Sequence, residues 1–213
     1  LKNLFFKDDG RNPSASFKDR AGAVALLNAI ENRAMKITGA STGNAASSMA
    51  CLSAAMGLSP IIFVPKTAPA AKIAQLLIFG AKVFAVDGSY DDAFDLCLKV
   101  TETFGWYNRN TGYNPFTREG KKTCAFEIVE QLNWQVPDKV VVPVGDGNII
   151  SGIWKGFKDF YNLGLIDRLP KLIAAQSEKS AAIANAVNKK ELVVKPVKAT
   201  TLADSISVDI PRD

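Results

Sequence analysis

The chain has 213 residues, with 26 lysines and arginines against 21 aspartates and glutamates, a net charge of +5 and no histidine. The lack of histidine excludes Ser-His-Asp and Cys-His nucleophile systems and histidine-ligated metal sites from this stretch. A content of 47% hydrophobic and 22% charged residues is typical of a globular chain with one or two domains.

The cysteines and the apolar runs indicate the cellular compartment of the protein. Cys51, Cys97 and Cys124 are far apart and lie in apolar stretches, which predicts buried, reduced thiols in a cytoplasmic protein without a disulfide or metal framework. No apolar run reaches the ~20 residues of a membrane helix, and the first residues lack a leader layout. The basic residues are scattered, so we expect neither a membrane nor a nucleic-acid partner.

Strand and helix patterns alternate along the chain. A helix pattern at residues 17–31 comes first, and then short apolar, β-branched runs predict strands at residues 36–41, 60–65, 82–87, 139–144 and 171–176. A 3.6-residue apolar spacing predicts helices at residues 44–56, 70–79, 90–104, 119–134 and 149–163. This order predicts an α/β fold with parallel sheets flanked by helices, and ligands beyond the carboxyl ends of the strands.

The turns between these elements fit the same order. Glycines directly follow four of the helix patterns, where a left-handed cap favours them: Gly57, Gly80, Gly105 and Gly164. Residues 188–201 are expected to form an irregular connection. Leu1 opens almost directly onto a functional-looking loop and Ile210–Asp213 reads as a turn, so we expect a fragment of a longer protein.

Lys18 lies where a predicted helix begins, after a turn with Asn12, Pro13 and two serines. Because the positive end of a helix dipole disfavours lysine, two readings are open. Lys18 is either solvated beside an offsetting Asp19, or an amine of lowered pKa that serves as a nucleophile and proton shuttle. By contrast, Lys66, Lys72, Lys121 and Lys122 are expected to be solvated surface residues.

A second loop, Ser41-Thr42-Gly43-Asn44, links a predicted strand to the next helix. Serine and threonine are common at the start of helices, and a capping role would be enough to explain Ser41 and Thr42. The same turn also offers backbone N–H groups and hydroxyls that can hold a carboxylate, and the Asn44 amide can bind a ring oxygen.

A third loop, Gly145-Asp146-Gly147-Asn148, lies between the strand at 139–144 and a helix. Its glycines let backbone amides approach a phosphate at the positive end of that helix. A tight connection without a ligand would use the same residues, and the Asp146 carboxylate would repel a phosphate unless it points outward.

Together the three loops resemble pyridoxal-phosphate enzymes of the tryptophan-synthase-β fold, and most closely the threonine synthases among them. Ser16-Phe17-Lys18-Asp19-Arg20 is similar to the cofactor-lysine motif, and the other two loops are similar to the substrate loop and the phosphate cradle. Further matches are Asn114-Pro115, Glu119-Gly120-Lys121-Lys122-Thr123, Trp154-Lys155-Gly156 and Thr201-Leu202-Ala203-Asp204-Ser205-Ile206.

The resemblance implies roles for these residues. Lys18 would be the Schiff-base lysine and the catalytic base, and Asn44 would contact the phenolic oxygen of pyridoxal 5'-phosphate. Gly145, Asp146, Gly147 and Asn148 would bind the cofactor phosphate, and Ser41 and Thr42 the substrate carboxylate. The implied reaction converts O-phosphohomoserine and water into threonine and phosphate.

The resemblance also implies an organisation. A small mobile domain, residues 32–118, would be inserted into a larger cofactor-binding domain made of 1–31 and 119–213, and the protein would be a homodimer. No metal is expected.

One departure concerns the substrate phosphate. Members of the family usually have an arginine at the position of Thr117, and here the arginine comes one residue later, as Arg118. Arg118 is therefore the expected phosphate contact, and a serine or threonine dehydratase, another β- or γ-replacement enzyme, or a non-catalytic binding relative remain as alternatives.

Overall fold

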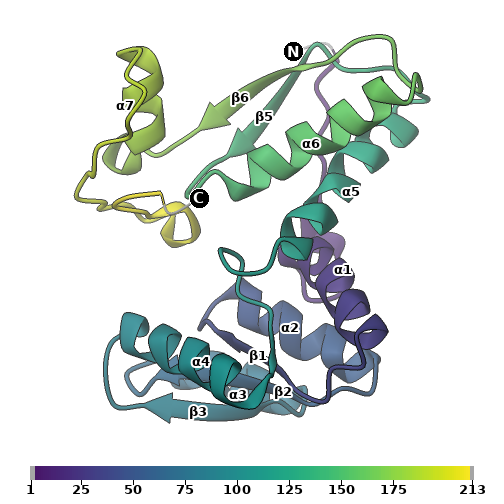
Figure 1. Ribbon diagram of the computed structural model, residues 1–213. Coiled ribbons are helices and arrows are strands. Elements are labelled where there is room, and N and C mark those ends of the chain that lie inside the picture. Colours follow the sequence, from purple (N-terminus) through teal and green to yellow (C-terminus); the bar gives the residue numbers. More distant parts are fainter. Residues whose placement is uncertain (1–2, 212–213) are drawn as a thin grey trace. The chain divides into compact units, whose positions relative to one another are not determined.

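The structure is a computed structural model that describes residues 3–211. It divides into two compact units, Leu1–Gly120 and Lys121–Asp213 (Figure 1). Leu1, Arg212 and Asp213, on which the expectation of a fragment partly depends, lie outside the described residues. No helix in the part of the chain that the structure describes is long and apolar enough to cross a membrane.

The first unit alternates helices and strands. Its elements are η1 (Asp9–Arg11), α1 (Lys18–Glu31), β1 (Ile37–Ala40), α2 (Asn44–Ala55), β2 (Pro60–Pro65), α3 (Ala70–Ile78), β3 (Lys82–Val86), α4 (Tyr90–Phe104) and β4 (Tyr107–Asn108). The helix α5 (Phe116–Gln131) begins in this unit and ends in the second.

The four strands form a parallel sheet in the order β3-β2-β1-β4, as the alternating pattern predicts. Side chains of β2 alternate between its two faces. Ile62 packs with residues of α1, α2 and α3, whereas Phe63 packs with Cys97 of α4. The sheet is therefore covered on both faces, and its carboxyl edge leads into the loops between β1 and α2 and after β4.

Helices α1 and α2 pack closely on one face of this sheet (Figure 1). A Cβ at Gly22 of α1 would lie 2.9 Å from the Oγ of Ser48 and 2.9 Å from Leu52 of α2. This close approach fixes the amino-terminal part of α1, which begins at Lys18, against α2.

The second unit holds β5 (Lys139–Pro143), α6 (Asn148–Asn162), β6 (Lys171–Ala175), η2 (Glu178–Ser180), α7 (Ala182–Asn188) and η3 (Asp204–Ile206). The strands β5 and β6 pair in parallel. Helices α5 and α6 cross at Gly156, where a Cβ would lie 2.6 Å from the carbonyl oxygen of Lys122, and Phe126 of α5 stacks on Phe160 of α6 with ring centroids 4.4 Å apart.

The predicted helices and strands are confirmed, with shifts of a few residues at their ends. The strand β4, the helix α7 and the short helices η1, η2 and η3 were not predicted. The four glycines after helices all have positive φ angles, and residues 189–203 are irregular as expected. In the structure α1 belongs to the first compact unit. The assignment of residues 1–31 and 119–213 to one larger domain stays a prediction.

Candidate active site

Lys18 is the first residue of α1, and the turn before it is held by its own polar side chains. The Asp19 carboxylate accepts hydrogen bonds from the backbone N–H of Ser14 at 2.7 Å and from its hydroxyl at 2.6 Å. Ser16 Oγ accepts from the Lys18 N–H at 3.2 Å. Because Asp19 and Ser16 are buried and Lys18 is half-buried, the turn presents this lysine from a fixed backbone.

The loop Ser41-Thr42-Gly43-Asn44 lies at the carboxyl end of β1, as predicted. Gly43 is the cap of α2 and makes no side-chain cap bond, so neither hydroxyl of the loop caps the helix. Ser41 Oγ instead accepts from the N–H of Gly43 at 3.2 Å, and the side chain of Asn44 is exposed. Their contact with a ligand stays a prediction.

The strand end before this loop is fixed from two sides. The Ala40 N–H donates to Asn110 Oδ1 at 2.8 Å, and the Tyr90 hydroxyl donates to the Ala40 carbonyl at 3.3 Å. The first unit therefore contains Lys18 and the Ser41–Asn44 loop, each on a well-anchored backbone.

Gly145-Asp146-Gly147-Asn148 lies in the second unit, between β5 and α6. Gly147 caps α6 with φ 95°, and the first bond within the helix runs from the Ser151 N–H to the Gly147 carbonyl at 3.1 Å. The amides of the first helical turn have no partner within the helix and can bind an anion. The Asp146 side chain is exposed, which meets the condition that it point outward.

Lys121 is a residue that the sequence interpretation placed wrongly. It is 1% exposed, not solvated, and its Nζ donates to Oδ1 of the buried Asn148 at the start of α6. Lys122 is also partly covered and pairs with Asp159 at 2.6 Å. A buried cation thus lies beside the candidate anion site of the second unit.

The structure gives Thr117 and Arg118 different environments. Thr117 is 0% exposed, and its hydroxyl donates to the Asn114 carbonyl at 2.8 Å, which secures the first turn of α5. Arg118 is half-buried in the same turn. Thr117 therefore has a structural role, and of these two residues only Arg118 has a side chain suited to a substrate phosphate.

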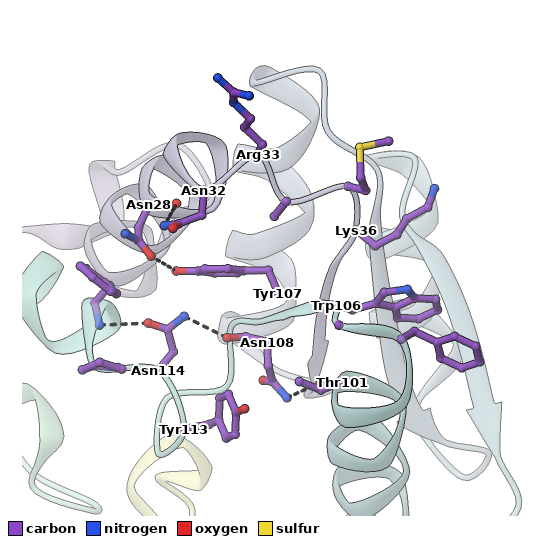
Figure 2. Close-up of a pocket in the computed structure, with 16 residues that line it drawn as sticks. Asn28, Asn32, Arg33, Lys36, Thr101, Trp106, Tyr107, Asn108, Tyr113 and Asn114 are labelled. Carbon is purple, nitrogen blue, oxygen red and sulfur yellow. Dashed lines mark hydrogen bonds between the residues drawn. The ribbon is translucent and has the colours of Figure 1, made fainter.

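The Asn114-Pro115 match lines a pocket of about 820 Å³ at the opposite edge of the first sheet, where β1 and β4 begin. Figure 2 shows its hydrogen bonds: the Tyr107 hydroxyl donates to Asn28 at 2.9 Å, and Asn114 Nδ2 donates to the Asn108 carbonyl at 2.9 Å. Because these polar groups bind one another and lie away from the Ser41–Asn44 loop, we assign this pocket no catalytic role.

Among the described residues, no group of three or more Cys, Asp and Glu side chains could hold a metal ion. The residues predicted for the site lie at the start of α1, in the Ser41–Asn44 loop after β1 and in the Gly145–Asn148 loop before α6.

Comparisons with known proteins identify the family of the chain. The model of the family described as pyridoxal-phosphate dependent enzyme matches residues 1–213. A threonine synthase of Methanocaldococcus jannaschii is 43% identical over 213 residues, which cover 99% of this chain and 52% of the relative. A threonine synthase of Synechocystis is 40% identical over 179 residues, which cover 84% of this chain and 46% of the relative. The chain thus spans about half the length of the curated relatives that it matches.

Solved structures confirm the predicted fold class. Threonine deaminase isoform 2 of Solanum lycopersicum aligns with a TM-score of 0.79 at 25% identity, covering 95% of this chain and 57% of that one. Maize serine racemase aligns with a TM-score of 0.80 at 22% identity, covering 97% and 60%. The parallel sheets with flanking helices are those of the tryptophan-synthase-β-like fold, and the chain belongs to the family of pyridoxal-phosphate dependent enzymes.

Proposed function

We propose that the protein containing this chain is a pyridoxal-phosphate-dependent threonine synthase, which converts O-phosphohomoserine and water into threonine and phosphate. One observation carries the proposal. Lys18 begins α1 after a turn that Ser14 and Asp19 secure, in a chain 43% identical to a named threonine synthase.

The residues present fit pyridoxal phosphate. A phosphate dianion needs several N–H donors and a favourable dipole, and the first turn of α6 after Gly145, Asp146 and Gly147 supplies both. The buried side chain of Asn148, held by Lys121, adds an amide and a nearby positive charge. Lys18, which would bind the aldehyde carbon of the cofactor, is half-buried and is the first residue of α1.

Each residue of the first unit has a proposed task. When bound, the cofactor supplies an electron sink that stabilises negative charge at the substrate Cα. Lys18 would hold the cofactor covalently, release it to the substrate amine, and then move protons at Cα and Cβ. Ser41 and Thr42 would bind the substrate carboxylate with hydroxyl and backbone donors, and Asn44 would bind the phenolic oxygen of the cofactor.

Arg118 is the proposed contact for the substrate phosphate. A guanidinium binds a phosphate with two parallel hydrogen bonds, which a threonine hydroxyl cannot do. The hydroxyl of Thr117 is engaged with Asn114, so Arg118, in the following position, is the residue that we propose for this contact.

A serine or threonine dehydratase is the second candidate. The lack of an arginine at position 117 favours it, since a dehydratase substrate carries no phosphate. The likeness to a structure titled threonine deaminase at 25% identity supports the same reading.

We further propose that the protein works in the cytoplasm as a homodimer. Cys51, Cys97 and Cys124 are thiols that form no disulfide, which supports a reducing compartment. The homodimer follows from the family resemblance, and sedimentation at neutral pH should give twice the mass of one chain.

The substrate assay separates the candidates. Purified protein loaded with pyridoxal phosphate should release phosphate and form threonine from O-phosphohomoserine, and Lys18→Ala should reduce the rate by at least about a thousandfold. The exposed Lys189→Ala serves as the control and should retain full activity. Ammonia and a keto acid from serine or threonine, without phosphate release, would identify the dehydratase and refute the synthase.

A further inference from the structure

Asn110 follows β4, and each polar group of this residue makes a hydrogen bond. Its side-chain oxygen accepts from the Ala40 N–H at 2.8 Å, and its side-chain nitrogen donates to the sulfur of Cys97 at 3.7 Å. Its backbone N–H donates to Asn108 Oδ1 at 2.8 Å, and its carbonyl accepts from the Asn114 N–H at 2.8 Å. Asn110 is 5% exposed, so these bonds form away from water.

The orientation of the Asn110 amide is determined by its two partners. Because the Ala40 N–H can only donate, the amide must present its oxygen to that group, and its nitrogen then points to Cys97 on α4. Burial raises the pKa of the Cys97 thiol, so the sulfur is a neutral, weak acceptor at neutral pH. The side-chain amide of Asn108 approaches the same sulfur at 3.7 Å, so Cys97 anchors both asparagines.

One end of this network fixes the loop proposed to bind the substrate carboxylate. Ala40 is the last residue of β1, and Ser41 directly follows it. A Cβ at Gly39 would lie 3.3 Å from Asn110 Oδ1, so the asparagine packs against β1 as well as bonding to it. Asn110 therefore sets the position of the backbone from which the Ser41–Asn44 loop begins.

The other end of the network fixes the first turn of α5, where Arg118 lies. The Asn114 N–H donates to the Asn110 carbonyl, and the Asn114 carbonyl accepts from the Thr117 hydroxyl at 2.8 Å. In the same turn, the Arg118 N–H donates to the Pro115 carbonyl at 2.9 Å. Hydrogen bonds thus connect the end of β1 with the turn that carries Arg118, all within the first compact unit.

We propose that Asn110 is a positioning residue that sets the spacing between the loop for the substrate carboxylate and Arg118, the contact for the substrate phosphate. The inference rests on the proposed function, because both binding roles come from there. A ligand held at both ends gains affinity only when its two contacts lie at the right spacing. Asn110 thereby selects substrates by their length without touching them.

The test compares ligands with two charged ends and with one, in the full-length protein loaded with pyridoxal phosphate. The two-ended ligand is 2-amino-5-phosphonopentanoate, the unreactive carbon analogue of O-phosphohomoserine. Norvaline carries only the amino-acid end, and inorganic phosphate only the other. By calorimetry, Asn110→Ala should weaken binding of the two-ended ligand by at least about tenfold and of each one-ended ligand by less than about twofold. The matched control Asn185→Ala, an exposed asparagine of α7, should change none of the three.

Two variants of Cys97 test the same proposal with Asn110 in place, which covers the case that Asn110→Ala does not fold. Cys97→Val removes the acceptor of the Asn110 amide and should weaken the two-ended ligand selectively, by about threefold. Cys97→Ser retains an acceptor and should bind all three ligands as the unsubstituted protein does. A merely structural role predicts equal weakening of all three ligands in Asn110→Ala and Cys97→Val, and that result would overturn the proposal.

Amide hydrogen exchange separates this inference from the proposed function, because it needs no ligand. Asn110→Ala should speed exchange of the Ala40 N–H by at least about tenfold, while the N–H of the buried Ile62 in β2 stays protected. Unchanged protection of Ala40 would overturn the role of Asn110. Unsubstituted protein that binds 2-amino-5-phosphonopentanoate no more tightly than norvaline would instead refute the proposed substrate, and the exchange result would then decide whether Asn110 anchors the loop.

Discussion

Thr117 and Lys121 lie one turn apart on the buried side of α5, with exposed fractions of 0% and 1%. Ala125 and Val129 continue this stripe at intervals of four residues, and both are 0% exposed. The spacing was visible in the sequence and could have predicted a buried lysine. We predicted an exposed lysine because most lysines in proteins are exposed. That general preference takes no account of a specific buried partner such as Asn148.

Thr117 offers a test of why this chain has no arginine at the position where the family resemblance leads us to expect one. Thr117→Arg should destabilise the fold by more than about 3 kcal/mol, because a long charged side chain cannot fit a fully buried position. Thr117→Val keeps the shape, loses the hydroxyl's bonds to the carbonyls of Asn114 and Thr111, and should cost about 1 kcal/mol. Urea unfolding of both variants measures the difference, and an arginine variant as stable as the valine variant would refute the structural role.

At the scale of elements, the strands and helices with strong patterns were predictable and the short, context-dependent ones were not. The pairing of β4 with β1 covers only Tyr107 and Asn108, too few residues for an alternating pattern. Helix α5 begins three residues before the predicted start, because the Asn114 side chain accepts from the Phe116 N–H at 2.9 Å and starts the turn. The existence of β4 depends on its pairing with β1, and the start of α5 depends on the local cap by Asn114.

The crossing of α5 and α6 depends on Gly156, which the sequence showed only as part of a motif. A Cβ at this position would lie 2.6 Å from the Lys122 carbonyl oxygen and 2.9 Å from the Ala125 Cβ. Gly156→Ala should therefore destabilise the protein by about 2–4 kcal/mol, although alanine favours helices elsewhere.

The matched control for Gly156→Ala is Lys158→Ala, an exposed position on the same helix, which should stay within about 0.5 kcal/mol of the unsubstituted protein. Thermal and urea unfolding measure the stability of both variants. Equal stability of the two would show that the helices separate at no cost and would contradict the close crossing.

At the scale of the whole molecule, the candidate residues are divided between the two compact units. Lys18 and the Ser41–Asn44 loop belong to the first, and Gly145–Asn148 to the second. The sequence was sufficient to place each of these loops after a predicted strand. Ligands of parallel sheets bind beyond the carboxyl ends of the strands, which is why these loops were candidates. The substrate was not predictable in the same way, since the arginine expected for a substrate phosphate comes one residue later than the resemblance implies, as Arg118 in place of Thr117.

The most direct test of the account is chemical mapping of the reactive lysine. The purified protein is incubated with pyridoxal phosphate, reduced with borohydride and digested, and the modified peptide is identified by mass spectrometry. The account predicts a single label on Lys18, absent from Lys18→Ala, and a loss of the visible absorption of the bound cofactor on reduction. A label on another lysine, such as the buried Lys121, or no label at all, would contradict it.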